Sequence, residues 1–197
     1  LHLDLQQGAR IVSRSPMVLK GLDDAPIMIG SSDASGAGLV LLSKRASSRF
    51  DHVRFEGFGP EQNGTPSIIF QETTIDLVDC HFQEVSSRRI ITGVRSSIAL
   101  ERCAFSGGSD QFTIAYCNTR IAGGALIGAA DDAVVMKGGQ LALNDIRIDA
   151  SGSAMVLDEF ARVTVDAGSI DATKDALRMS EGASISMHGG SISSRKG

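Results

Sequence analysis

Aspartates spaced by about one repeat are the residues in this chain that best suit chemistry. Asp110, Asp132 and Asp175 stand in line with Ser153 at intervals of 22, 21 and 22 residues, and Asp131 directly precedes Asp132. Two carboxylates can divide the acid and base roles in the hydrolysis of a glycosidic bond. Clustered carboxylates also supply the oxygen ligands that Ca²⁺ prefers. Both chemistries require a fold that stacks residues about 22 positions apart.

A structural role for the same aspartates is the interpretation that we favour. A carboxylate at a chain corner accepts a hydrogen bond from a backbone N–H and so stabilises the turn. Asp110, Asp132 and Asp175 each lie two residues before an apolar segment, which is a corner position. We therefore predict turn-stabilising roles for these three residues. Catalysis by Asp110, Asp131 and Asp132 is one alternative, and calcium binding is another.

A repeat of about 22 residues would position these side chains. An apolar column recurs at steps of 27, 23, 21, 22, 22 and 22 residues: Phe55, Phe82, Phe105, Leu126, Ile148, Ile170 and Ile192. The residues two, five and seven positions before each member are mostly apolar or small, and those between them are mostly polar or small. Such alternation indicates strands that bury one face. A third apolar segment follows in each coil, as at Ile90-Ile91.

The fold class that follows is all-β, a single-stranded right-handed parallel β-helix of eight or nine coils. Three short strands cannot bury their inner face alone, whereas stacked coils form a continuous core. Helical repeats are excluded because the apolar segments are short and rich in β-branched residues. We expect one domain over residues 1–197, with less regular coils in 1–60 and regular coils in 61–197. Loops are expected at 31–38 and 57–66, where Glu61, Gln62 and Asn63 would form one wall of a groove.

Composition excludes several classes of function. The net charge is −4 and the basic residues are scattered, which argues against a nucleic-acid partner. No apolar run approaches the ~18 residues of a membrane-spanning helix. Only 5% of the residues are aromatic, with no Trp and one Tyr, so the chain has few side chains that could stack on sugars. None of the four histidines has a partner at zinc-ligand spacing, so we predict no metal or cofactor other than calcium.

The thiols are expected to be structural. Cys80 and Cys103 fall in one inward column on successive coils, where their Cα atoms could approach disulfide range. We expect two reduced, buried side chains instead, because free cysteine packs as a small apolar residue. Cys117 lies outside this column, so no three-cysteine metal site is predicted.

Small side chains dominate the outward strand positions late in the chain. Arg120 and Arg147 interrupt them and, together with Asp175, are the candidate binding residues. A flat face of this kind could pack against a glycan or another protein, or remain an ordinary solvated sheet surface.

The coil that carries Ile185, Met187 and Ile192 is followed by only five residues. An uncovered solenoid end exposes unpaired backbone groups and core side chains. We therefore expect further coils or a second subunit to cover this end, with contacts between Ser184 and Ser194.

Several segments resemble a known superfamily. Ser109-Asp110-Gln111-Phe112, Asp131-Asp132-Ala133-Val134 and Lys174-Asp175-Ala176-Leu177 are similar to strand openings of the pectate-lyase-like β-helix superfamily. Ser48-Arg49-Phe50-Asp51-His52-Val53-Arg54-Phe55 resembles non-catalytic repeats of bacterial surface and periplasmic proteins, of the NosD type or accompanying spore-coat-type kinase domains. The resemblance implies a non-catalytic extracellular, cell-surface or periplasmic module. Its role would be structural or binding, towards a polysaccharide or a partner protein.

The resemblance also carries an enzymatic alternative. Asp110 with Asp131 and Asp132 is similar to the three-acid arrangement of polygalacturonase-like hydrolases, which implies a polysaccharide hydrolase, lyase or epimerase. Two departures weigh against it. The next coil has no His near Ser153, and the only Arg-Lys pair, Arg195-Lys196, stands at the end of the chain. A slice of a larger surface or tail-fibre protein is a third interpretation.

Overall fold

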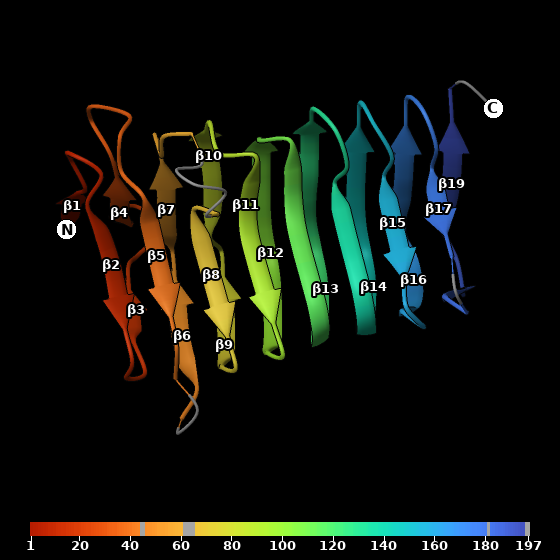
Figure 1. Cartoon of the computed structure of the whole chain (residues 1–197), viewed down its shortest axis with the longest axis horizontal. Coiled ribbons are helices and arrows are strands. Elements are labelled where there is room, and N and C mark those ends of the chain that lie inside the picture. The colour runs from red at the N-terminus through yellow and green to blue at the C-terminus, as the bar shows by residue number, and fades with distance from the viewer. Residues whose placement is uncertain (44–45, 61–65, 181, 196–197) are drawn as a thin grey trace.

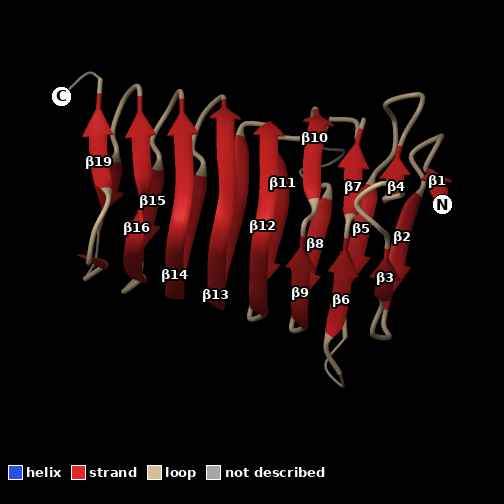
Figure 2. Ribbon diagram, turned by 180° about the vertical axis from the view of Figure 1, so that it is seen from behind, coloured by secondary structure: helices blue, strands red, loops and turns tan. Residues whose placement is uncertain are grey.

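The chain forms a stack of parallel strands in the computed structural model, which describes residues 1–43, 46–60, 66–180 and 182–195. In these ranges all regular structure is β-strand, so none of it supplies a helix that could cross a membrane. Figure 1 shows the strands side by side along one axis, with the two termini at opposite ends. Figure 2 shows the same stack from behind, with strands and loops only. The predicted parallel β-helix is confirmed, with about eight turns.

The described part of the chain contains strands whose lengths increase toward the middle of the stack. They are β1 (His2–Asp4), β2 (Arg10–Ser13), β3 (Val18–Lys20), β4 (Ile27–Gly30), β5 (Gly38–Leu41), β6 (Ser48–Asp51), β7 (Val53–Glu56), β8 (Ile68–Gln71), β9 (Thr74–Val78), β10 (His81–Val85), β11 (Arg89–Val94), β12 (Ser97–Gly107), β13 (Asp110–Ala129), β14 (Val134–Ala150), β15 (Met155–Asp158), β16 (Arg162–Ala172), β17 (Leu177–Met179), β18 (Ser184–Met187) and β19 (Ser191–Ser194).

The predicted apolar column is one continuous ladder of parallel pairs. Phe55 pairs with Phe82, which pairs with Phe105, and the ladder continues in register to Ile192. It also extends backward through Ile29 to Leu3, so the irregular N-terminal segments are coils of the same stack. A one-residue slip would turn this column toward solvent, and burial of the inner face therefore fixes the register.

Aromatic rings fill the core of the middle coils. The ring of Phe82 stacks on Phe55 with a centroid distance of 5.0 Å and on Phe105 at 4.3 Å. Phe112 meets the edge of Phe105 at 6.4 Å. All four side chains are 0–3% exposed. The expected burial of Phe82, Phe105, Ile148 and Ile170 in one column is thus confirmed.

Between His52 and Gly182, two corners of the coils turn through residues with left-handed backbone geometry. One corner column has φ angles of 48° to 65°, at His52, Asp79, Arg102, Gly123, Asp145 and Ala167. The other has φ angles of 47° to 72°, at Glu72, Arg95, Tyr116, Gly138, Phe160 and Gly182. Side chains other than glycine are disfavoured there by about 1–2 kcal/mol. Charged and aromatic residues nevertheless occupy most of these positions, which the apolar periodicity does not predict.

The first coils are longer than the later ones. Leu3, Ile29, Phe55 and Phe82 follow one another at 26, 26 and 27 residues. The extra length forms loops, and the expected loop at 31–38 lies between β4 and β5. The predicted groove wall of Glu61, Gln62 and Asn63 lies outside the described residues.

Candidate functional site

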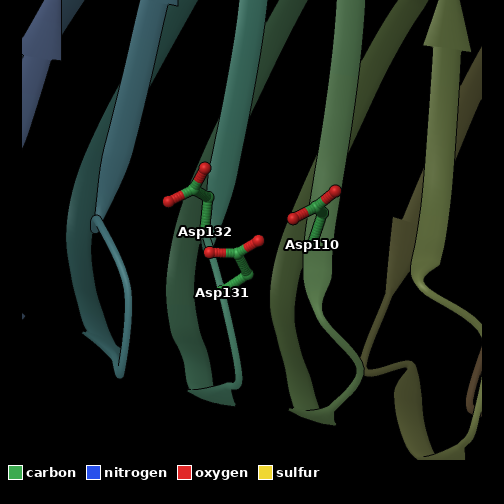
Figure 3. Close-up of side chains that lie close together, drawn as sticks. All are labelled: Asp110, Asp131 and Asp132. Carbon is green, nitrogen blue, oxygen red and sulfur yellow. The ribbon is translucent and has the colours of Figure 1, made fainter.

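The stack brings Asp110, Asp131 and Asp132 together at one edge. Asp110 opens β13, and the other two lie in the turn between β13 and β14. Because Phe112 pairs with Val134, Asp110 and Asp132 occupy the same position on successive coils. Figure 3 shows the three side chains on adjacent coils, and one carboxylate oxygen from each lies within 4.8 Å of the others. The predicted clustering is therefore present.

Asp110 is the most buried member of this aspartate cluster, with 7% of its surface exposed. Burial raises the pKa of its carboxyl, since the charged form is penalised in a poorly solvated position. The Arg88 guanidinium, 3.4 Å from the carboxylate, opposes that rise, as does a hydrogen bond from the backbone of Asp132. The negative charges of Asp131 and Asp132 add to the rise. A carboxyl with a raised pKa retains a proton to higher pH than an ordinary aspartate does.

The two column aspartates bind backbone groups of the coil that follows each of them. Oδ1 of Asp132 accepts a hydrogen bond of 2.9 Å from the N–H of Ser153. Asp110 receives the equivalent contact from the backbone of Asp132. Each carboxylate thus stabilises the corner of the next coil, in agreement with the turn role that we expected for both.

Asp175 is more exposed than the other two aspartates of its column. Its side chain is exposed, and within the described ranges no hydrogen bond reaches its carboxylate. Only its backbone takes part in pairing, as the carbonyl accepts a hydrogen bond of 3.0 Å from the N–H of Ala154. The residue that would make the equivalent contact, 22 positions further on, lies outside the described residues, so the turn role of Asp175 stays a prediction.

Buried polar atoms and an open groove adjoin the cluster. Gln111 donates to the carbonyls of Gly107 and Ile127 at 3.0 and 2.6 Å, while its Oε1 has no partner in the described structure. Next to it, Arg88 and Ser109 help to line a groove of about 490 Å³. Arg88 connects the groove to the cluster through its ion pair with Asp110, whereas none of the three aspartates lines the groove.

The other candidate binding residues do not join this cluster. Arg120 is exposed on β13 and lies in register with Ala142. Arg147 is exposed on β14, in register with Ala125, and its guanidinium is 3.9 Å from Asp149. Among the described residues, no contact connects either arginine to the aspartates. Arg120 and Arg147, which the sequence analysis named together, thus lie on different segments of the coil and away from the aspartate cluster.

All three cysteines are free and buried, as predicted for Cys80 and Cys103. Cys80 and Cys103 are neighbours, and a hydrogen bond to Cys103 together with burial raises the pKa of the Cys80 thiol. Cys117 lies in a different column, in register with Gly139. All three thiols are buried, and a buried thiol reacts poorly with reagents in solution, so these groups are structural.

Sequence reasoning missed two features of this surface. Arg88, the ion-pair partner of Asp110, stands 22 residues before it, and that interval is one full coil. Tyr116 and Phe160 both lie exposed at a left-handed corner, and their separation of 44 residues corresponds to two coils. Both features could have been found from the sequence if the 22-residue period had also been applied to charged and aromatic residues outside the apolar columns.

Comparison with known proteins adds no assignment to this geometry. Neither the scan against protein-family models nor the searches of curated proteins and solved structures finds a match to the chain.

Proposed function

We propose that the chain is a non-catalytic, extracellular, cell-surface or periplasmic β-helix module that binds a polysaccharide. The observation that carries the proposal is the engagement of the aspartate column in the backbone of the stack. Asp132 accepts a hydrogen bond from Ser153, and Asp110 is buried against Arg88. Carboxylates with these structural partners are accounted for without a substrate. The similarity of the strand openings to the pectate-lyase-like superfamily, in which carbohydrate is the common ligand, supports a polysaccharide.

The architecture suits an extended ligand. Coils stacked about 4.8 Å apart repeat the same side-chain positions along a rod on the order of 40 Å long. A linear polymer can therefore meet equivalent groups on several coils. Each contact adds affinity without a deep pocket, because the contacts are linked through one chain.

The test is a comparison of binding and cleavage on one panel of polysaccharides. The panel contains neutral β-linked glucans, xylan, mannan and chitin oligomers, together with polygalacturonate and alginate. We expect retardation of the protein by at least one polymer in affinity electrophoresis. We also expect no release of reducing ends or unsaturated products from any polymer. Absence of binding across the panel would refute the proposal.

A polysaccharide-cleaving enzyme is the second candidate, because three carboxylates lie within 4.8 Å and the pKa of Asp110 is raised. An enzyme of this kind should release products from polygalacturonate or alginate, whereas a non-catalytic module should not. Product release that Asp132→Asn abolishes while the melting temperature stays within a few degrees would establish this enzyme.

A further inference from the structure

Two exposed aromatic side chains occupy the same corner of the rod, two coils apart. Tyr116 in β13 is 54% exposed, and Phe160, between β15 and β16, is 69% exposed. Both have left-handed backbone geometry, with φ angles of 54° and 61°. Together with Gly138 and Gly182, which hold the equivalent position on the alternate coils, these residues are here named the aromatic corner.

Each ring lies across the glycine of the next coil. A Cβ at Gly138 would stand 2.7 Å from Cδ1 of Tyr116, and one at Gly182 would stand 2.6 Å from Cδ1 of Phe160. The glycines therefore make room for the rings to pack against backbone. One side of each ring is supported by the protein, and the remainder faces solvent.

The tyrosine ring is also held from its far end. Its hydroxyl donates to the carboxylate of Glu159, and that carboxylate pairs with Lys137 at 2.6 Å. The Lys137–Glu159 ion pair holds the carboxylate that accepts the hydrogen bond of the tyrosine hydroxyl. Tyr116 is thus fixed in place along the rod, so that little conformational freedom would be lost when a ligand stacks on it.

The aromatic residues are costly at these positions. A non-glycine residue with this backbone geometry loses about 1–2 kcal/mol, and the alternate coils avoid the cost with Gly138 and Gly182. Both rings are largely exposed, so burial of apolar surface does not offset this strain. Glu72 and Arg95 have the same geometry at this corner, so the exposed apolar surface of the two rings is what sets Tyr116 and Phe160 apart.

A row of polar side chains runs alongside the rings. Asn118, Gln140 and Arg162 are exposed on β13, β14 and β16, and they pair in register with one another. Each lies two residues beyond the corner position of its coil. In the described parts of the chain, none of the three side chains has a hydrogen-bond or ion-pair partner. Donors and acceptors are thus presented at a spacing of about 4.8 Å, next to the rings.

From this juxtaposition we infer that the aromatic corner is the binding site for an extended, neutral, equatorially linked polysaccharide. The inference rests on the proposed function and assigns its site. A pyranose ring offers an apolar C–H face to an aromatic ring and hydroxyl groups at its rim to amide and guanidinium groups. Tyr116 and Phe160 are separated by two coils, about 9.6 Å, which suits stacking under alternate sugars of an extended chain. Asn118 and Gln140 present neutral amides beside Tyr116, which suits the uncharged hydroxyl groups of a neutral polymer.

The test removes both rings without disturbing the corner. The double variant Tyr116→Gly/Phe160→Gly introduces the residue that the neighbouring coils already carry, so the fold should be retained. For the neutral β-linked polymer that the unmodified protein binds best, we expect about a tenfold loss of affinity in each single variant and a larger loss in the double variant. Phe160→Tyr should preserve binding, because the stacking face is kept.

Asp145→Ala is the matched control, since Asp145 is exposed with left-handed geometry at the opposite corner. It should leave affinity unchanged. Gln140→Ala should weaken binding by a few fold without affecting the melting temperature, which separates loss of a ligand contact from loss of structure.

The outcomes distinguish the site from the function. If the unmodified protein binds no polysaccharide, the proposed function fails and the site fails with it. If the unmodified protein binds and the double variant binds equally well, the function stands and this site is wrong. If the double variant instead loses self-association while glycan binding is unchanged, the corner is a protein interface and the assignment is overturned.

Discussion

The central ring of the aromatic core gives the most quantitative prediction, the cost of Phe82→Ala. Phe82 is 1% exposed and stacks on Phe55 and Phe105 at centroid distances of 5.0 and 4.3 Å. Truncation of a buried Phe to Ala costs about 3–5 kcal/mol, and each aromatic pair adds about 0.5–1.5 kcal/mol beyond burial. Because Phe82 stacks on a ring at either side, we expect a value near the upper end of the range, about 5 kcal/mol.

Urea unfolding followed by far-UV circular dichroism measures this loss of stability, because the chain has no Trp and its signal comes from the strands. Phe160→Ala is the control of the same chemistry at a residue that is 69% exposed, and it should cost less than about 1 kcal/mol. Phe82→Leu should cost less than Phe82→Ala, since it leaves a smaller cavity. A cost below about 1 kcal/mol for Phe82→Ala would refute the stacked core.

Four further predictions follow from the corners, the aspartates and the last coil. Ala167→Gly should stabilise the protein by up to about 1 kcal/mol in thermal melts, because Ala167 has a φ of 64°, whereas Ala142→Gly within β14 should destabilise it by about 0.5–1 kcal/mol. The pKa of the Asp110 carboxyl is raised in the folded state, so the stability that Asp110 contributes is fully present below pH 3.8, the ordinary pKa of the group, and falls as pH rises through the folded pKa. Asp110→Asn should remove that fall from melting curves taken between acidic and neutral pH. Asp132→Asn should cost about 0.5–1.5 kcal/mol through the weakened Ser153 contact, and added Ca²⁺ should not raise the melting temperature; a large calcium-dependent rise would instead show a metal site. Ile192→Lys should disperse any dimer seen by light scattering, whereas a monomer at high concentration would contradict association through the final coil.

The strand columns could be predicted because they depend on local alternation and on a fixed period. The neighbours of Phe82, Phe105 and Ile170 alone indicate that these side chains face inward, and stacking then fixes the register. The position of Asp110 beside Asp132 followed from the same period. These features need only the rule that equivalent residues of successive coils lie next to each other.

The corners could not be predicted in this way. Left-handed geometry is signalled by glycine or asparagine, whereas Arg102, Tyr116 and Phe160 carry no such signal. The turn role expected for Asp175 stays a prediction. Asp110 and Asp132 bind backbone groups one coil further on, and the equivalent residue for Asp175 stands at the very end of the chain, beyond the described residues.

The direction of the hydrogen bonds between coils determines how the rod would respond to a pulling force. These bonds run along the long axis, from each coil to the next, so a load applied to the two ends opens them one coil at a time rather than shearing them together. Each released coil of about 22 residues lengthens the chain by about 70 Å when extended. The molecule would therefore extend at low force in regular steps, each of which corresponds to the unfolding of one coil.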